Sequence, residues 1–122
     1  MRKPRLEPGR LHPITVEPAE GRVTVRYGDR QIAATDRALV LREASYPPVY
    51  YVPLDEVDPA VLEPSTHTSY CPYKGDASYY SLHDGDRRAA DAVWTYRTPY
   101  DAVAGIAGHV AFYPEHVEIA NS

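Results

Sequence analysis

Residues 68–80 read TSYCPYKGDASYY, and this stretch shows how the chain folds back on itself. Thr and Tyr favour strands, whereas proline and glycine favour turns. Gly75 also permits a backbone angle that other residues avoid. The stretch therefore predicts two antiparallel strands, at residues 67–70 and 77–83, joined by a tight turn at 71–75.

Further short strands are predicted on both sides of this hairpin. Val23, Val25 and Tyr27 alternate with polar residues, and Gly28 then offers a turn before the next strand. Other strands are predicted at 38–43, 49–52, 92–96 and 110–113. Short helical turns are predicted at 55–62, with Asp58 as N-cap, and at 100–106. About eight short strands separated by turn residues predict an all-β sandwich or open barrel.

The length of 122 residues fits one domain, predicted at 20–122 and preceded by an extended arm at 1–19. Prolines disfavour a helix in this arm, because each proline lacks an amide donor and restricts the backbone of the preceding residue. They are Pro4, Pro8, Pro13 and Pro18. The arm also carries Arg2, Lys3, Arg5 and Arg10, which we interpret as a solvated basic tail.

Composition argues against several classes of protein. The net charge of −4 gives no basic surface for nucleic acid, and no apolar run approaches the length of a membrane span or a signal peptide. We therefore expect a cytoplasmic protein with no nucleic-acid or membrane partner. Cys71 is the only cysteine, and the five histidines lack paired-ligand spacing, so we predict no metal and no cofactor.

The stretch 68–80 resembles the signature of an uncharacterised family catalogued as domain of unknown function 427. Four further blocks match in order: RE at 42–43, YYVP at 50–53, VWTY at 93–96 and GHVAFYP at 108–114. The resemblance implies a β-tent, with two antiparallel sheets of short strands packed at an angle, a pocket between them, and one or two short helical turns. The family has at times been labelled nucleotidyltransferase-like. The Gly-rich loop and paired acidic ligands of phosphoryl transfer are absent from this sequence.

Cys71, Glu43 and Lys74 are the candidate catalytic residues. Cys71 lies in a tight turn near Lys74, where amides and an ammonium could stabilise a thiolate, although free cysteine more often acts as a small apolar filler. Lys74 could pair with Glu43, bind an anionic ligand or be a solvated turn residue. Glu43 shares a strand face with Leu39 and Leu41, so it either enters a pocket or ends the strand.

The aromatic residues Tyr51, Tyr79, Trp94 and Tyr96 are candidates for a ligand-binding box. Strand residues alternate between faces, so Tyr51 and Tyr50 cannot both face one pocket, nor can Tyr79 and Tyr80. Trp94 and Tyr96 share a face. Such rings suit a flat or cationic ligand, but they could equally form the hydrophobic core.

We therefore expect a small-molecule-binding β domain whose site contains Glu43, Tyr51, Cys71, Lys74, Tyr79, Trp94 and Tyr96. One alternative is an enzyme that uses Cys71 or Glu43 in thiol or acid–base chemistry, which the sequence favours less. Another is a protein-interaction domain. Exposed edge strands also leave a homodimer open.

Overall fold

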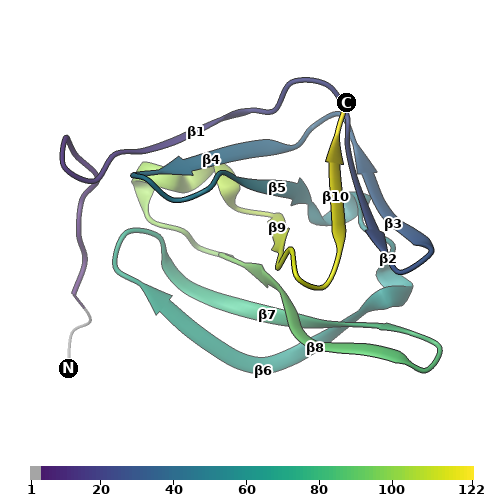
Figure 1. The fold of residues 1–122 in the computed structure, drawn as a ribbon. Coiled ribbons are helices and arrows are strands. Elements are labelled where there is room, and N and C mark those ends of the chain that lie inside the picture. The colour runs from purple at the N-terminus through teal and green to yellow at the C-terminus, as the bar shows by residue number, and fades with distance from the viewer. Residues whose placement is uncertain (1–3) are drawn as a thin grey trace.

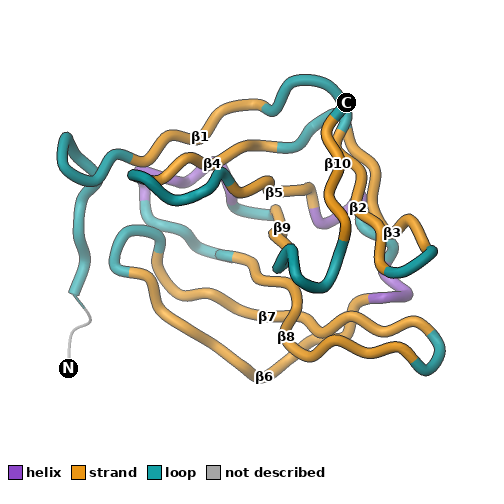
Figure 2. The backbone as a smooth tube through the Cα atoms, in the orientation of Figure 1, coloured by secondary structure: helices purple, strands orange, loops and turns teal. Residues whose placement is uncertain are grey.

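The computed structural model describes residues 4–122; Arg2 and Lys3 of the predicted basic arm lie outside the described residues. Within this range the chain is all-β, as predicted (Figures 1 and 2). The strands are β1 (Ile14–Pro18), β2 (Val23–Tyr27), β3 (Arg30–Thr35), β4 (Leu39–Glu43), β5 (Val49–Pro53), β6 (Leu62–Cys71), β7 (Gly75–Asp84), β8 (Arg87–Thr95), β9 (His109–Phe112) and β10 (Glu118–Asn121). Three short 3₁₀ helices join them: η1 (Leu54–Glu56), η2 (Pro59–Val61) and η3 (Asp101–Ile106).

The strands form two antiparallel sheets, which confirms the β-tent prediction. The large sheet has seven strands in the order β1-β4-β5-β9-β8-β7-β6, and the small sheet has three in the order β10-β2-β3. In Figure 1 the large sheet curves, so that β4 and β5 lie opposite the β7–β8 hairpin, and the small sheet lies at one side. This curvature creates the concave surface on which the candidate site lies.

Two hydrophobic clusters hold the sheets together. The first joins the small sheet to the large one, because Val23, Val25 and Ile32 pack with Val93 and Val110. The second lies within the curve of the large sheet, where η3 contributes Val103 and Ile106, both fully buried. The second cluster contains three of the predicted site tyrosines: Tyr51, Tyr79 and Tyr96.

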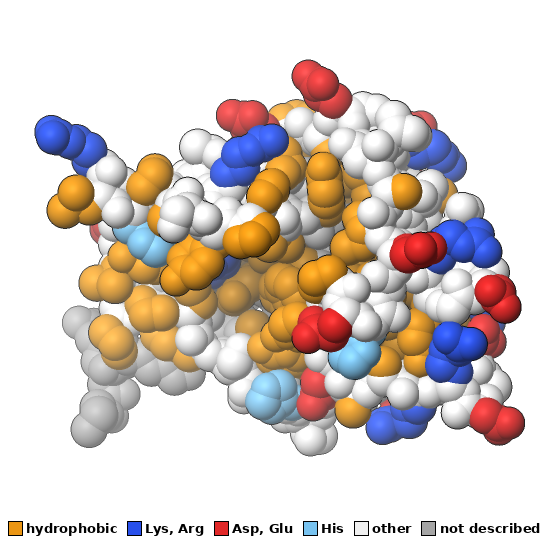
Figure 3. Space-filling model, in the orientation of Figure 1, with side chains coloured by type: hydrophobic (Ala, Val, Ile, Leu, Met, Phe, Trp, Pro, Cys, Tyr) orange, Lys and Arg blue, Asp and Glu red, His pale blue; other side chains and the backbone are white. Residues whose placement is uncertain are grey.

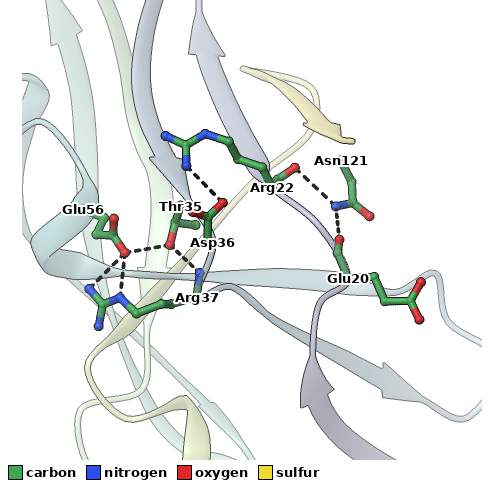
Figure 4. Close-up of polar contacts among 7 residues, drawn as sticks. All are labelled: Glu20, Arg22, Thr35, Asp36, Arg37, Glu56 and Asn121. Carbon is green, nitrogen blue, oxygen red and sulfur yellow. Dashed lines mark hydrogen bonds and ion pairs between the residues drawn. The ribbon is translucent and has the colours of Figure 1, made fainter.

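Polar contacts gather at one end of the small sheet, where Thr35, Val23 and Asn121 lie on neighbouring strands (Figure 4). The buried Thr35 hydroxyl donates to Glu56 of η1 over 2.7 Å, and Arg37 donates to the same carboxylate over 2.9 Å. At the same end, the Asn121 side-chain amide donates to the carbonyls of Glu20 and Arg22. The small sheet is therefore attached to the large sheet by apolar packing, and hydrogen bonds tie its end to η1 and to the segment before β2.

Several element boundaries differ from the sequence predictions. β6 and β8 are longer than predicted, and β1 and β10 were not predicted. Pro64 lies inside β6, which is tolerated because β6 is an edge strand, and the pairing of β6 with β7 is irregular between Pro64 and Thr68. The predicted helical turns are the 3₁₀ helices η1, η2 and η3, and Asp58 caps η2 by accepting from the Ala60 amide.

The segment before β2 contacts the body of the molecule. β1 pairs with β4, and the Leu6 amide donates to the Pro72 carbonyl over 2.9 Å. The Arg5 guanidinium lies 4.2 Å from the centre of the Tyr100 ring. This segment therefore lies against the 71–75 turn. None of the helices in residues 4–122 is long and apolar enough to cross a membrane.

Candidate functional site

A cavity of about 230 Å³ lies within the curve of the large sheet. Its lining residues come from β4, β5, β7, β8 and the adjoining loops, and none of those described comes from the small sheet. Figure 3 shows this face of the molecule hollowed, with hydrophobic side chains gathered around the hollow. The cavity therefore lies inside one curved sheet, whereas the family resemblance implies a pocket between two sheets.

The structure brings the seven predicted site residues together. Six of them line the cavity: Glu43, Tyr51, Lys74, Tyr79, Trp94 and Tyr96. Cys71 lies beside it, with its Sγ 3.5 Å from the Lys74 Nζ. Strand alternation explains the selection, because Tyr51 lines this cavity and its neighbour Tyr50 does not, and the same holds for Tyr79 and Tyr80.

An ion pair forms the polar part of the cavity wall. Lys74 Nζ lies 2.5 Å from Glu43 Oε1, and His12 Nε2 lies 2.7 Å from Glu43 Oε2. The Lys74 and Glu43 side chains are only 11% and 14% exposed. Burial alone would raise the pKa of Glu43, but the hydrogen bonds from Lys74 and His12 outweigh it and lower that pKa. The pairing of Lys74 with Glu43 was one of the sequence predictions, and it is confirmed.

The 71–75 turn holds Lys74 in this position. The Lys74 amide donates to the Cys71 carbonyl over 3.2 Å, and the Lys74 carbonyl accepts from the Tyr100 amide over 3.0 Å. Gly75 has a φ of +109°, which confirms the predicted unusual backbone. The turn thus ties the lysine to the segment that precedes η3, and the lysine backbone cannot move independently of the cavity.

The aromatic side chains of the cavity are linked to one another. Trp94 Nε1 donates to the Tyr51 hydroxyl over 3.2 Å, and the two rings meet edge to face. Trp94 also packs on Tyr113, with ring centres 4.6 Å apart. Burial raises the pKa of Tyr51 to about 12 and raises that of Tyr96 further, so both hydroxyls keep their protons at neutral pH. These rings pack in the second hydrophobic cluster and also line the cavity. They are therefore part of the hydrophobic core and part of the pocket wall at the same time.

A second hollow of about 500 Å³ adjoins the first. The two share five lining residues: Glu43, Tyr46, Pro47, Val49 and Trp94. The second hollow extends towards the small sheet, where Phe112, Pro114 and Ile119 line it. It therefore adjoins the cavity across these shared side chains and is mainly apolar.

Some site residues were missed by the sequence reasoning. His12 reaches Glu43 across 31 positions of sequence and stacks on Tyr73 with ring centres 4.0 Å apart; nothing local in the sequence signals this contact. Tyr113 lies in the matched block at 108–114 and was passed over as the end of a strand. His109, also in that block, does not line the cavity and places its Nδ1 3.0 Å from the Ala107 carbonyl oxygen.

Within residues 4–122, no three His, Cys, Asp or Glu side chains are grouped so as to hold a metal ion. Comparison with family models matches residues 15–122 to the family described as "Domain of unknown function (DUF427)", which confirms the resemblance. No curated protein gives a significant match to the chain.

Proposed function

The chain belongs to the DUF427 family of domains of unknown function, and we propose that it is a small-molecule-binding β domain whose ligand occupies the aromatic cavity. One observation carries the proposal. Side chains from four strands and from the 71–75 turn converge on a single cavity of about 230 Å³. A purely structural core would be filled by its own side chains.

The size and lining of the cavity define the class of ligand. Drug-sized ligands occupy pockets of roughly 300–1,000 Å³, so this cavity suits a smaller molecule or one part of a larger one. The rings of Tyr51, Trp94 and Tyr96 offer apolar walls, and the paired Glu43 and Lys74 offer polar groups. Apolar walls with a few fixed polar groups are typical of small-molecule sites.

Native mass spectrometry of the protein purified from its own host tests this function. We expect a small molecule to accompany the wild-type protein and to be lost from Trp94→Ala. Tyr80→Phe is the matched control, because Tyr80 lies on the same strand as Tyr79 but does not line the cavity. Far-UV circular dichroism establishes that each variant is folded. Should Trp94→Ala fail to fold, Tyr96→Phe keeps the ring in place and should still weaken retention.

Two results would overturn the binding function. In one, the folded Trp94→Ala protein keeps the same molecule as fully as the wild type does. In the other, no molecule accompanies the wild-type protein, and titration of metabolite mixtures leaves the fluorescence of Trp94, the only tryptophan, unchanged.

A thiol enzyme is the second candidate, and one contact favours it. The Lys74 ammonium lies 3.5 Å from the Cys71 thiol, and a cation beside a thiol is typical of reactive cysteines. Glu43 is less suited to act as a base, because each of its oxygens is already hydrogen-bonded. A covalent adduct on the wild-type protein that disappears in Cys71→Ser would support this candidate; a non-covalent ligand retained by both proteins would contradict it.

A further inference from the structure

Some of the hydrogen-bond donors that line the cavity have no acceptor among the described residues. The Tyr51 hydroxyl accepts from Trp94, so its own proton needs a different acceptor, and none is found in residues 4–122. The Tyr96 hydroxyl has no hydrogen-bond partner in the same range, yet it is not among the fully buried unsatisfied atoms, so it reaches open space. Both residues line the cavity. Two phenol protons are therefore available to a ligand.

Lys74 adds a third donor. An ammonium group has three N–H bonds, and the two contacts of Lys74 in the described part of the chain go to Glu43 and Cys71. Both oxygens of the only carboxylate in the cavity lining already have a partner, since one lies against Lys74 and the other against His12. A ligand that fits this surplus of donors must supply acceptor oxygens.

The second hollow is lined mainly by apolar side chains and therefore suits an apolar group. Glu43 is the only charged residue among those described that line it, and Glu43 already has two partners. The remaining lining residues are aromatic rings, prolines and aliphatic side chains, among them Pro47, Phe112 and Ile119. Because Trp94 and Val49 border both hollows, a single molecule can extend from one into the other.

We propose that the ligand is an amphiphile with a carbonyl or carboxylate head, which accepts hydrogen bonds from Tyr51, Tyr96 and Lys74, and an apolar tail in the second hollow. This inference rests on the proposed binding function and specifies its ligand class. The head lies in the aromatic cavity within the curve of the large sheet. The tail passes Trp94 and ends between the 44–48 loop and Ile119 of β10.

A probe series separates the two parts of the proposal. Hexanoate, octanoate, octanamide and octylamine are titrated into the full chain, with Trp94 fluorescence and calorimetry as readouts. We expect octanoate or octanamide to bind at one site, and octylamine to bind at least tenfold more weakly. The comparison of octanoate with octanamide shows whether the head is an anion or a neutral carbonyl. Two added methylenes should tighten binding from hexanoate to octanoate by about tenfold.

Two variants test the two ends of the ligand. Tyr96→Phe, which removes one donor and keeps the ring, should weaken binding of the acceptor probes by about fivefold to tenfold. Ile119→Ser, at a residue that lines the second hollow and not the cavity, should weaken octanoate more than hexanoate once circular dichroism shows the variant folded. Tyr80→Phe is the control and should leave every affinity unchanged.

The outcomes separate this inference from the proposed function. The proposal that the ligand head accepts hydrogen bonds would be overturned if octylamine bound as tightly as octanoate, or if Tyr96→Phe left the affinities unchanged. Equal affinities for hexanoate and octanoate would overturn the proposal that an apolar tail occupies the second hollow. A molecule without an apolar tail that accompanies the wild-type protein and is lost in Trp94→Ala would keep the binding function and refute the amphiphile. Absence of binding by every probe and of any accompanying molecule would refute both.

Discussion

The side chains of Glu43 and Lys74 depend on each other. Both are largely removed from water, and each provides the nearest opposite charge to the other. Removing one partner of such a pair leaves the other charge uncompensated, which costs more than the pair itself contributes. Each charge of the pair therefore depends on the presence of the other, whether or not a ligand is bound.

We predict that Glu43→Gln lowers the free energy of unfolding at pH 7 by about 3 kcal/mol. Lys74→Met should also destabilise the protein, and the double variant should lose less than the sum of the single losses. Urea unfolding of the four proteins measures these values. Asp36→Asn is the control, because the Arg22–Asp36 pair is exposed and its loss should cost less than about 1 kcal/mol.

The effect of Glu43→Gln should also depend on pH. The folded state lowers the pKa of Glu43 below its ordinary value of 4.5, so the ionised carboxylate stabilises the protein above that pH. This contribution is lost as the pH falls through the lowered pKa. The stability difference between wild type and Glu43→Gln should therefore shrink below pH 4.5. A difference that stays constant from pH 7 to pH 3 would show that the carboxylate has no special stabilisation.

At the scale of elements, the 71–75 turn depends on Gly75. Its φ of +109° lies in a region that residues with a Cβ rarely adopt, although an added Cβ would meet only ordinary contacts, the nearest at 3.6 Å. We predict that Gly75→Ala costs about 1–3 kcal/mol in unfolding free energy through backbone strain. Gly9→Ala is the matched control, because Gly9 has open space around it and no positive φ. Equal thermal unfolding of the two variants would contradict this account.

The same turn shows what can be predicted from sequence. Pro72 and Gly75 are local signals, so the β6–β7 hairpin was predicted close to its true place. β1 alternates between apolar and polar residues, but its prolines led the segment to be predicted as an extended arm. β10 was missed because its four residues, EIAN, show only weak alternation. β1 pairs with β4, and β10 pairs with β2. These pairings join residues far apart in the sequence, so a short stretch of sequence does not reveal them.

The candidate site was predicted in part for a similar reason. Strand alternation allows only one of Tyr50 and Tyr51 to face a pocket and places Trp94 and Tyr96 on one face, so the number of candidate wall residues could be narrowed from sequence. The curvature of the large sheet, which turns that face into a cavity, depends on packing between distant strands. His12 joins the site only because its segment lies along the 71–75 turn.

At the scale of the whole molecule, the first hydrophobic cluster couples the two sheets. Val25 of β2 is fully buried and packs in one cluster with Val93 of β8 and Val110 of β9. Thr35 and Arg37 add hydrogen bonds from the small sheet to Glu56. The small sheet therefore cannot unfold without exposing apolar surface of the large sheet, and a chain of this size should unfold in one cooperative transition.

We predict that Val25→Ala, in the small sheet, destabilises the site in the large sheet equally. Loss of two buried methyl groups should cost about 2 kcal/mol. Trp94 fluorescence reports the large sheet and far-UV circular dichroism reports all strands, and both should shift to the same lower urea midpoint. Thr24→Ala, on the partly exposed face of β2, should change the midpoint little. If the circular dichroism signal of Val25→Ala fell before the Trp94 signal, the small sheet would be an independent unit, and the cavity would not need it to keep its shape.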